Sequence, residues 1–226
     1  MPISKMIAEA IGTFALVFAG CGAIMVSERV TEIQSIPVVF GLVIAVMIYA
    51  VGHISGAHFN PAVTAAFAVI KKFPKEQVFY YWLAQFSGAL IASTTLYFIL
   101  PSGIEYGATL PEVNLISAVV WEIIMTFFLM FVITAVATDS RAEGVMAGAA
   151  IGGVVMLCAF LGGPITGASL NPARSFAPAL FQGSLDTIWI YFLGPFLGAS
   201  LGALTYEKIR CDNSNNNSST TTEGCC

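Results

Sequence analysis

The chain has 226 residues, of which 57% are apolar and only 10% are charged, and its mean hydropathy is positive. This composition excludes an ordinary soluble domain and predicts one compact unit of several membrane spans, because a spanning helix takes about 20 residues. The net charge of −4 comes without a dense basic run, which argues against nucleic acid as a partner and leaves the lipid bilayer as the expected surroundings.

Apolar runs of near-spanning length follow one another along the chain. They cover residues 6–26, 36–51, 78–100, 115–137, 145–161 and 188–205, and they predict six spans. Two further apolar runs, 61–70 and 172–181, have about half the required length. Each begins at an Asn-Pro pair, which favours a helix cap followed by the first helical residue. We interpret these two runs as half-helices that enter the membrane without crossing it.

The sequence contains an internal repeat. Residues 55–64 read SGAHFNPAVT and residues 166–175 read TGASLNPARS, at an offset of 111, while residues 8–14 echo 121–127 at 113 and residues 85–89 echo 195–199 at 110. The repeats extend over about 5–100 and 114–208. Each holds three full spans, an odd number, so the second repeat must enter the membrane from the opposite face.

The predicted fold class is therefore an all-α membrane protein with six transmembrane helices and two re-entrant half-helices in inverted three-helix repeats. A channel domain is expected over residues 1–208. The remaining residues, 209–226, are polar and of low complexity, and they predict a disordered cytoplasmic tail.

The basic residues indicate an orientation. Cytoplasmic termini leave Arg29 outside and Arg174 within a half-helix, and place the other seven basic residues inside: Lys5, Lys71, Lys72, Lys75, Arg141, Lys208 and Arg210. Because cytoplasmic loops are enriched in Lys and Arg, we expect both termini in the cytoplasm. The expected location is the plasma membrane.

The segments that precede the two Asn-Pro pairs are expected to line a pore. Backbone without helical hydrogen bonds is tolerated at membrane depth only where it is buried in protein or faces a wet cavity. The predicted pore-lining residues are Gly56, Ala57 and His58 in the first segment and Thr166, Gly167 and Ser169 in the second.

The two Asn-Pro-Ala motifs are the strongest candidates for function. They consist of Asn60, Pro61 and Ala62 and of Asn171, Pro172 and Ala173. Asn60 and Asn171 would cap half-helices whose N-termini each carry roughly half a positive charge, so the pair would repel cations. Amide hydrogens donated into the pore would orient a central water and interrupt proton transfer. The alternative, two ordinary helix starts, is disfavoured because the motif is repeated in a matching ten-residue context.

Arg174 follows the second motif and would add a full positive charge near the outer mouth; the alternative is a charge that extends to the membrane surface from a helix end. Glu9 and Glu122 occupy matching repeat positions inside apolar spans. They are either an ion or proton site or structural acceptors for the amides of the re-entrant segments, and their pairing favours the structural role. No metal site is expected, because His53 and His58 are the only histidines.

The paired motifs together with Glu9 and Glu122 resemble the aquaporins, the major intrinsic protein family, over about residues 1–208. The resemblance implies a right-handed six-helix bundle with two half-helices, assembled as a homotetramer in which each subunit has its own pore. Carried over by distance from the motifs, the family's selectivity filter falls on Phe40, Ala159, Ala168 and Arg174.

Ala159 departs from strict water channels of the family, which usually have His there, so two alanines are expected to widen the filter. Ser175, Ala179, Tyr191 and Phe192 nevertheless resemble the water-selective branch. The expected function is a passive water channel that excludes protons and ions and also passes small neutral solutes, without enzymatic activity or cofactor. The alternatives are a facilitator of glycerol and other small neutral solutes, and a poorly conducting structural membrane protein of the same fold.

Overall fold

The computed structural model describes residues 2–27, 36–100, 106–139, 142 and 144–210, in which all regular structure is helical. The helices are α1 Ile3–Ser27, α2 Ile36–Ser55, α3 Pro61–Val69, α4 Lys75–Ile99, α5 Leu115–Thr138, the 3-10 turn η1 Gly144–Met146, α6 Ala147–Thr166, α7 Pro172–Gln182 and α8 Ile190–Ile209. The predicted fold class is confirmed. Arg29, Arg141 and the tail after Arg210 lie outside the described residues.

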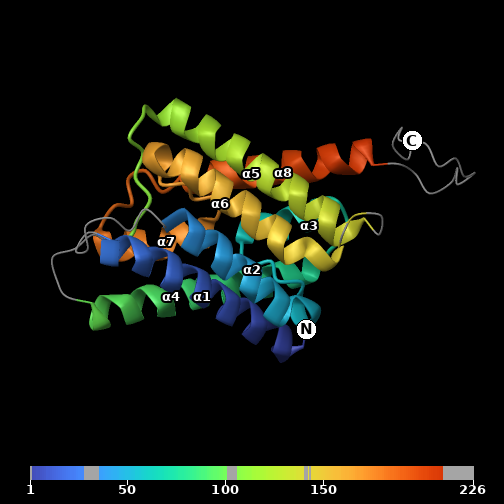
Figure 1. Ribbon diagram of the computed structural model, residues 1–226, viewed down its shortest axis with the longest axis horizontal. Helices are drawn as coiled ribbons and strands as arrows, with labels where there is room; N and C mark the ends of the chain where they lie inside the picture. Colours follow the sequence, from blue (N-terminus) through green and yellow to red (C-terminus); the bar gives the residue numbers. More distant parts are fainter. Residues whose placement is uncertain (1, 28–35, 101–105, 140–141, 143, 211–226) are drawn as a thin grey trace, which may run out of the picture.

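Five described helices are long and apolar enough to cross a membrane: α1, α2, α4, α5, and α6 together with η1. The sixth expected span corresponds to α8, which has 20 residues but is less apolar because it is rich in small residues and includes Glu207 and Lys208. It packs along α5 in the most extensive helix–helix contact of the described chain (Figure 1). Close packing against α5 explains the glycines of α8, because a Cβ atom added to Gly194, Gly198 or Gly202 would collide with α5.

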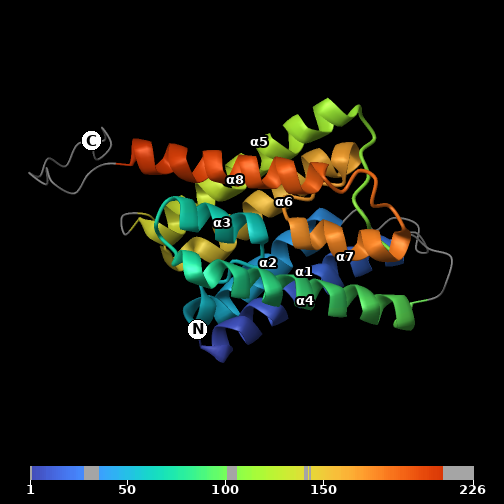
Figure 2. The ribbon, with the colours of Figure 1, turned by 180° about the vertical axis from the view of Figure 1, so that it is seen from behind.

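The helix contacts follow the repeat. α1 packs against α4 as α5 packs against α8, and α2 and α6 pack against each other across the repeats. The two half-helices lie towards opposite ends of the bundle, whereas the start of α1 and the end of α8 lie at the same end (Figures 1 and 2). The arrangement matches two three-helix units that enter the membrane from opposite faces.

Glycines permit the closest helix crossings. A Cβ atom added to Gly41 would lie near the carbonyl oxygen of Gly152, and one added to Gly152 would meet the carbonyl oxygen of Gly41. Backbone therefore contacts backbone where α2 crosses α6, which only residues without a side chain allow.

Candidate pore and its constriction

Both re-entrant segments have the same unusual backbone conformation. Positive φ angles recur at the same three places of each repeat, at Gly56, Ala57 and Phe59 and at Gly167, Ala168 and Leu170. Only glycine adopts such angles readily, so the alanines, Phe59 and Leu170 need surrounding contacts to hold them. This backbone turns its peptide groups away from helical pairing and towards other partners.

Glu122, on α5, supplies those partners in the second repeat. Its Oε1 accepts hydrogen bonds from the hydroxyl of Thr166 at 2.7 Å and the amide of Ser169 at 2.9 Å, and its Oε2 accepts from the amide of Leu170 at 2.9 Å. The side chain is fully buried. One carboxylate therefore fixes the turn that leads into α7.

Glu9, on α1, makes the corresponding contacts in the first repeat. It accepts from the Ser55 hydroxyl at 2.7 Å and from the amides of His58 at 2.9 Å and Phe59 at 2.7 Å. It also accepts from Nε2 of Gln85 at 2.8 Å, a contact without a counterpart in the second repeat because proline occupies position 195. The two acids thus hold their loops in the same way, with one additional donor at Glu9.

Two tyrosines complete this framework. The hydroxyl of Tyr81 donates to the carbonyl of Ser55 at 2.6 Å, and that of Tyr191 donates to the carbonyl of Thr166 at 2.8 Å. From the sequence, Tyr191 was linked only to the water-selective branch, and Tyr81 was not identified. The signal was present, because both tyrosines precede the echoed segments 85–89 and 195–199 at the same offset.

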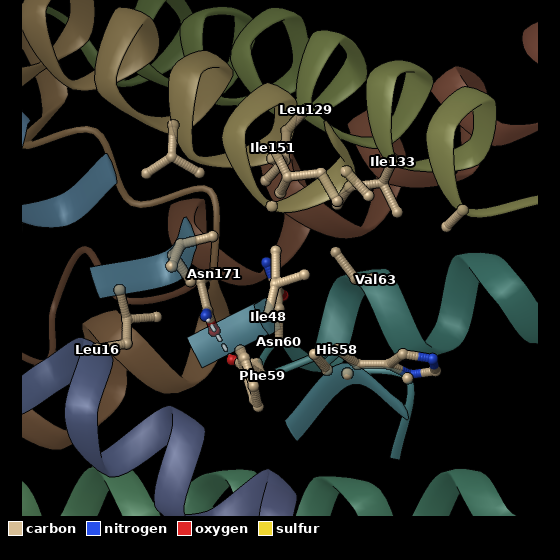
Figure 3. A pocket seen from close by; sticks show the side chains of 18 of the residues that line it. Leu16, Ile48, His58, Phe59, Asn60, Val63, Leu129, Ile133, Ile151 and Asn171 are labelled. Atoms are coloured by element: carbon tan, nitrogen blue, oxygen red, sulfur yellow. Dashed lines mark hydrogen bonds between the residues drawn. The ribbon is translucent and has the colours of Figure 1, made fainter. Parts of the chain in front are cut away.

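The two motifs meet through their asparagines. Oδ1 of Asn60 accepts from the amide of Ala62 at 2.9 Å, and Oδ1 of Asn171 accepts from the amide of Ala173 at 3.0 Å, so each caps its own half-helix. Their Nδ2 atoms cross over: that of Asn60 donates to the carbonyl of Leu170 at 2.7 Å, and that of Asn171 donates to the carbonyl of Phe59 at 2.9 Å (Figure 3). Each of these two crossing bonds uses one of the two hydrogens on the side-chain Nδ2 atom.

A cavity of 530 Å³ runs alongside this pair. At one end it is lined by Tyr49, His53 and Gly144, and at the other end it reaches Arg174. Its polar lining comes mainly from the re-entrant segments and the two asparagines, whereas the facing wall is apolar: Ile48, Leu129, Ile133 and Ile151 (Figure 3). Such a cavity offers hydrogen-bonding groups to a small polar molecule on one side, while the apolar wall on the other side binds it only weakly.

A second cavity of 570 Å³ begins where the first one ends. It is lined by residues of α2, α6 and the segment before α5, including Ile36, Glu112 and Gly163. Among the described residues, the two cavities have four lining residues in common: Phe40, Ala159, Ala168 and Arg174. These are the four residues predicted to form the filter, and they lie at the junction of the two cavities.

Arg174 is the only charged side chain at this junction and is 2% exposed. Its Nη1 donates to the carbonyl of Gly107 at 2.8 Å, and its Cζ lies 5.1 Å from the centre of the Phe40 ring, within the range of a cation–π contact. Within the described part of the chain, Nε of Arg174 has no acceptor. The Arg174 side chain lines both cavities and therefore meets any molecule that crosses the junction.

The sequence analysis did not identify the segment that supplies this carbonyl, residues 106–112. Oε1 of Gln182 accepts from the amides of Tyr106 at 3.2 Å and Ala108 at 3.4 Å, and the Thr109 hydroxyl donates to that of Ser175 at 2.7 Å. The Ser175 hydroxyl in turn donates to that of Ser169 at 2.6 Å. No periodicity or motif marks this segment, because its contacts depend on folding over α7.

The predicted pore-lining residues divide into two groups. Gly56, Ala57, His58 and Ser169 line the first cavity, and Gly167 lines the second. Thr166 corrects the prediction: it is fully buried and lines neither cavity, because its hydroxyl is directed at Glu122. Pro61, Ala62, Pro172 and Ala173 are buried as the first residues of the two half-helices.

Residues 2–206 match the profile of the family described as major intrinsic protein. The chain belongs to this family. It is 49% identical to Nodulin-26 of Glycine max over 212 residues, which cover 92% of this chain and 78% of that protein. It is also 49% identical to aquaporin NIP1-1 of Zea mays over 215 residues, with 93% and 76% covered.

A solved structure agrees with these relatives. The aquaglyceroporin of Plasmodium falciparum superimposes with a TM-score of 0.81 at 25% identity, over 92% of this chain and 96% of that one. This major intrinsic protein is therefore an integral membrane channel for water and small solutes, and not an enzyme. The resemblance stated from the sequence is confirmed at the level of the family.

Proposed function

We propose that this channel conducts water and, more slowly, small neutral solutes up to the size of glycerol, with Phe40, Ala159, Ala168 and Arg174 as its selectivity filter. The observation that carries the proposal is that, within the part of the chain that the structure describes, these four residues line both cavities and no others do. A solute that travels from one cavity to the other passes one aromatic ring, one cation and two methyl groups. The two alanines leave room beside the ring, while the guanidinium of Arg174, which lines both cavities, offers N–H donors to a water or hydroxyl oxygen.

The exclusion of protons and cations is assigned to the asparagine pair. Asn60 and Asn171 line the first cavity at the N-termini of α3 and α7, where two partial positive charges face each other. Each amide keeps one hydrogen beyond its bond to the opposite segment. A water between them accepts these hydrogens and donates outward in both directions, which interrupts a proton wire.

A facilitator of glycerol and related solutes is the second candidate. It is favoured by Ala159 and Ala168 at the junction and by the structural similarity to a protein described as an aquaglyceroporin. The two candidates differ in one quantity, the ratio of glycerol to water permeability.

The test is stopped-flow light scattering on proteoliposomes of the purified protein, with empty vesicles as the control. We expect fast water flux with a low activation energy and a smaller glycerol flux. Ala159→His places a ring at the junction and is expected to lower glycerol flux about tenfold or more while water flux persists, because small changes in pocket volume discriminate at this scale. Equal glycerol flux in the variant and the wild type would refute the filter. Water flux equal to that of empty vesicles would favour the structural alternative.

The same family membership supports a homotetramer in the plasma membrane with both termini cytoplasmic. The exposed apolar side chains on α6, such as Leu157, Phe160 and Leu161, suit contact with lipid or a neighbouring subunit. Mass determination of the protein in nanodiscs tests the assembly, and a monomer would contradict it.

A further inference from the structure

Two glycines of α1 lie against aromatic rings. A Cβ atom added to Gly20 would overlap the ring of Phe40, and one added to Gly12 would overlap the ring of Phe59. In both cases the contact would be closer than real carbon atoms approach, so the ring would have to move. The rings are therefore seated directly on the backbone of α1.

Phe40 cannot move without affecting the junction. Its ring touches α1 at Gly20, lies beneath the guanidinium of Arg174 and lines both cavities. Protein interiors are closely packed, and the unfilled space beside this ring is that of the two cavities. A side chain at position 20 would therefore displace the ring towards the path of the solute.

We propose that Gly20 is a specificity-determining positioning residue: by lacking a side chain it lets Phe40 lie back against α1 and keeps the filter wide. This inference rests on the proposed function, because it acts through Phe40 as a filter residue. It adds a residue that does not itself line either cavity. The width of the filter is thus set by three small residues, Gly20 behind the ring and the two alanines beside it.

The other repeat shows that this position does not require glycine for packing. The offset that relates the starts of the two repeats, 113, places Ile133 opposite Gly20, and the offset of the motifs, 111, places Ile151 opposite Phe40. Ile133 and Ile151 line the first cavity together (Figure 3). A branched side chain therefore fits at the equivalent crossing, and glycine is needed only where an aromatic ring lies at the junction.

The first test compares Gly20→Ala with the wild type in proteoliposomes, using water, hydrogen peroxide, urea and glycerol as solutes. We expect the permeability to the largest solute that the wild type admits to fall about tenfold relative to water. If the wild type admits water alone, the water flux itself is expected to fall. Gly153→Ala is the matched control, because a Cβ there meets nothing within 4 Å. An unchanged permeability ratio in Gly20→Ala would overturn the inference.

Phe40→Leu separates this inference from the proposed function. Alone, it is expected to raise glycerol flux; if it does not, the filter assignment fails. Combined with Gly20→Ala it should restore the lost flux, because the shorter side chain no longer meets the new methyl group. If glycerol flux rises in Phe40→Leu but does not fall in Gly20→Ala, the filter assignment stands and the role of Gly20 is refuted. If Gly20→Ala does not fold, recovery of folded protein in the double variant supports the contact, and a double variant that stays unfolded contradicts it.

Discussion

At the scale of single residues, Glu9 and Glu122 show how a carboxylate is retained inside an apolar helix. Each is fully buried and accepts hydrogen bonds from two consecutive backbone amides and one hydroxyl. Buried carboxylates are costly unless they are saturated with donors. The contacts repay that cost and hold non-glycine residues at positive φ, and they oppose the interpretation of these acids as an open ion site.

Removal of one acid is expected to destabilise its loop selectively. Glu122→Ala leaves three donors without an acceptor, at about 1–3 kcal/mol each. We expect a lower midpoint in thermal unfolding by fluorescence and a loss of water flux. Glu122→Gln retains an acceptor oxygen and should therefore lose less thermal stability and less water flux than Glu122→Ala. An alanine variant as stable as the wild type would show that the loop does not depend on this residue.

Arg174 is expected to exclude larger and charged solutes through its bulk and charge. Arg174→Val should raise glycerol permeability about tenfold and admit cations, because it removes the guanidinium from the junction. Stopped-flow light scattering measures the glycerol flux, and a pH-sensitive dye inside the vesicles measures the proton flux. Arg210→Val, at the end of α8, is the control and should change neither. Glycerol and proton permeabilities equal to those of the wild type would remove Arg174 from the filter.

At the scale of elements, segment 106–112 connects two parts of the junction. It is held to the end of α7 by Gln182 and to its start by the bond between Thr109 and Ser175, and the amide of Glu112 donates to the carbonyl of Ile165 at 2.9 Å. Because Gly107 of this segment accepts from Arg174, the segment positions the cation. A connecting segment thus holds Arg174 at the junction through its backbone.

Loosening this segment is expected to broaden selectivity. Thr109→Val removes a buried hydroxyl and leaves Ser175 without its donor, which should raise the ratio of glycerol to water flux several-fold at unchanged water flux. Thr95→Val is the matched control, since that hydroxyl is exposed and bonds within its own helix to Ile91. Hydrogen exchange over residues 106–112 provides a second readout. If hydrogen exchange over residues 106–112 increases while the ratio of glycerol to water flux stays the same, the segment has no role in the filter.

At the scale of the whole molecule, each half-helix is supported by the other repeat. α3 packs against α8 as well as α4, and α7 packs against α4 as well as α1. The asparagines add hydrogen bonds in both directions across the centre. Neither repeat completes its half of the pore alone, so the two are expected to fold as one cooperative unit.

The arrangement also predicts where the ends of the chain lie. The start of α1 and the end of α8 share one end of the bundle, and the positive residues near them favour the cytoplasm (Figure 1). Epitope tags at both ends should be protected from protease in intact, right-side-out cells and cleaved after permeabilisation. Cleavage of one tag alone before permeabilisation would contradict the proposed topology.

The sequence by itself determined the class of fold, the two half-helices and the pairing of the acids, because hydropathy, the Asn-Pro starts and the repeat are local or periodic signals. It placed the half-helices at 61–70 and 172–181, close to α3 and α7 as observed. It also underestimated α2 and α6, which continue to Ser55 and Thr166 past less apolar residues. Those ends are fixed by contacts with Tyr81, Tyr191 and the acids rather than by hydropathy.

Only the tertiary structure showed which residues hold the four junction residues in place. Gly107 and Thr109 are distant in sequence from Arg174 and Gln182, and nothing in their local pattern distinguishes them from residues of an ordinary loop. Gly20 is one of several glycines in an apolar helix until its contact with Phe40 is seen. The physical reason is that selectivity depends on the positions of side chains from separate helices, and those positions are set by close packing across the repeats rather than by any one segment.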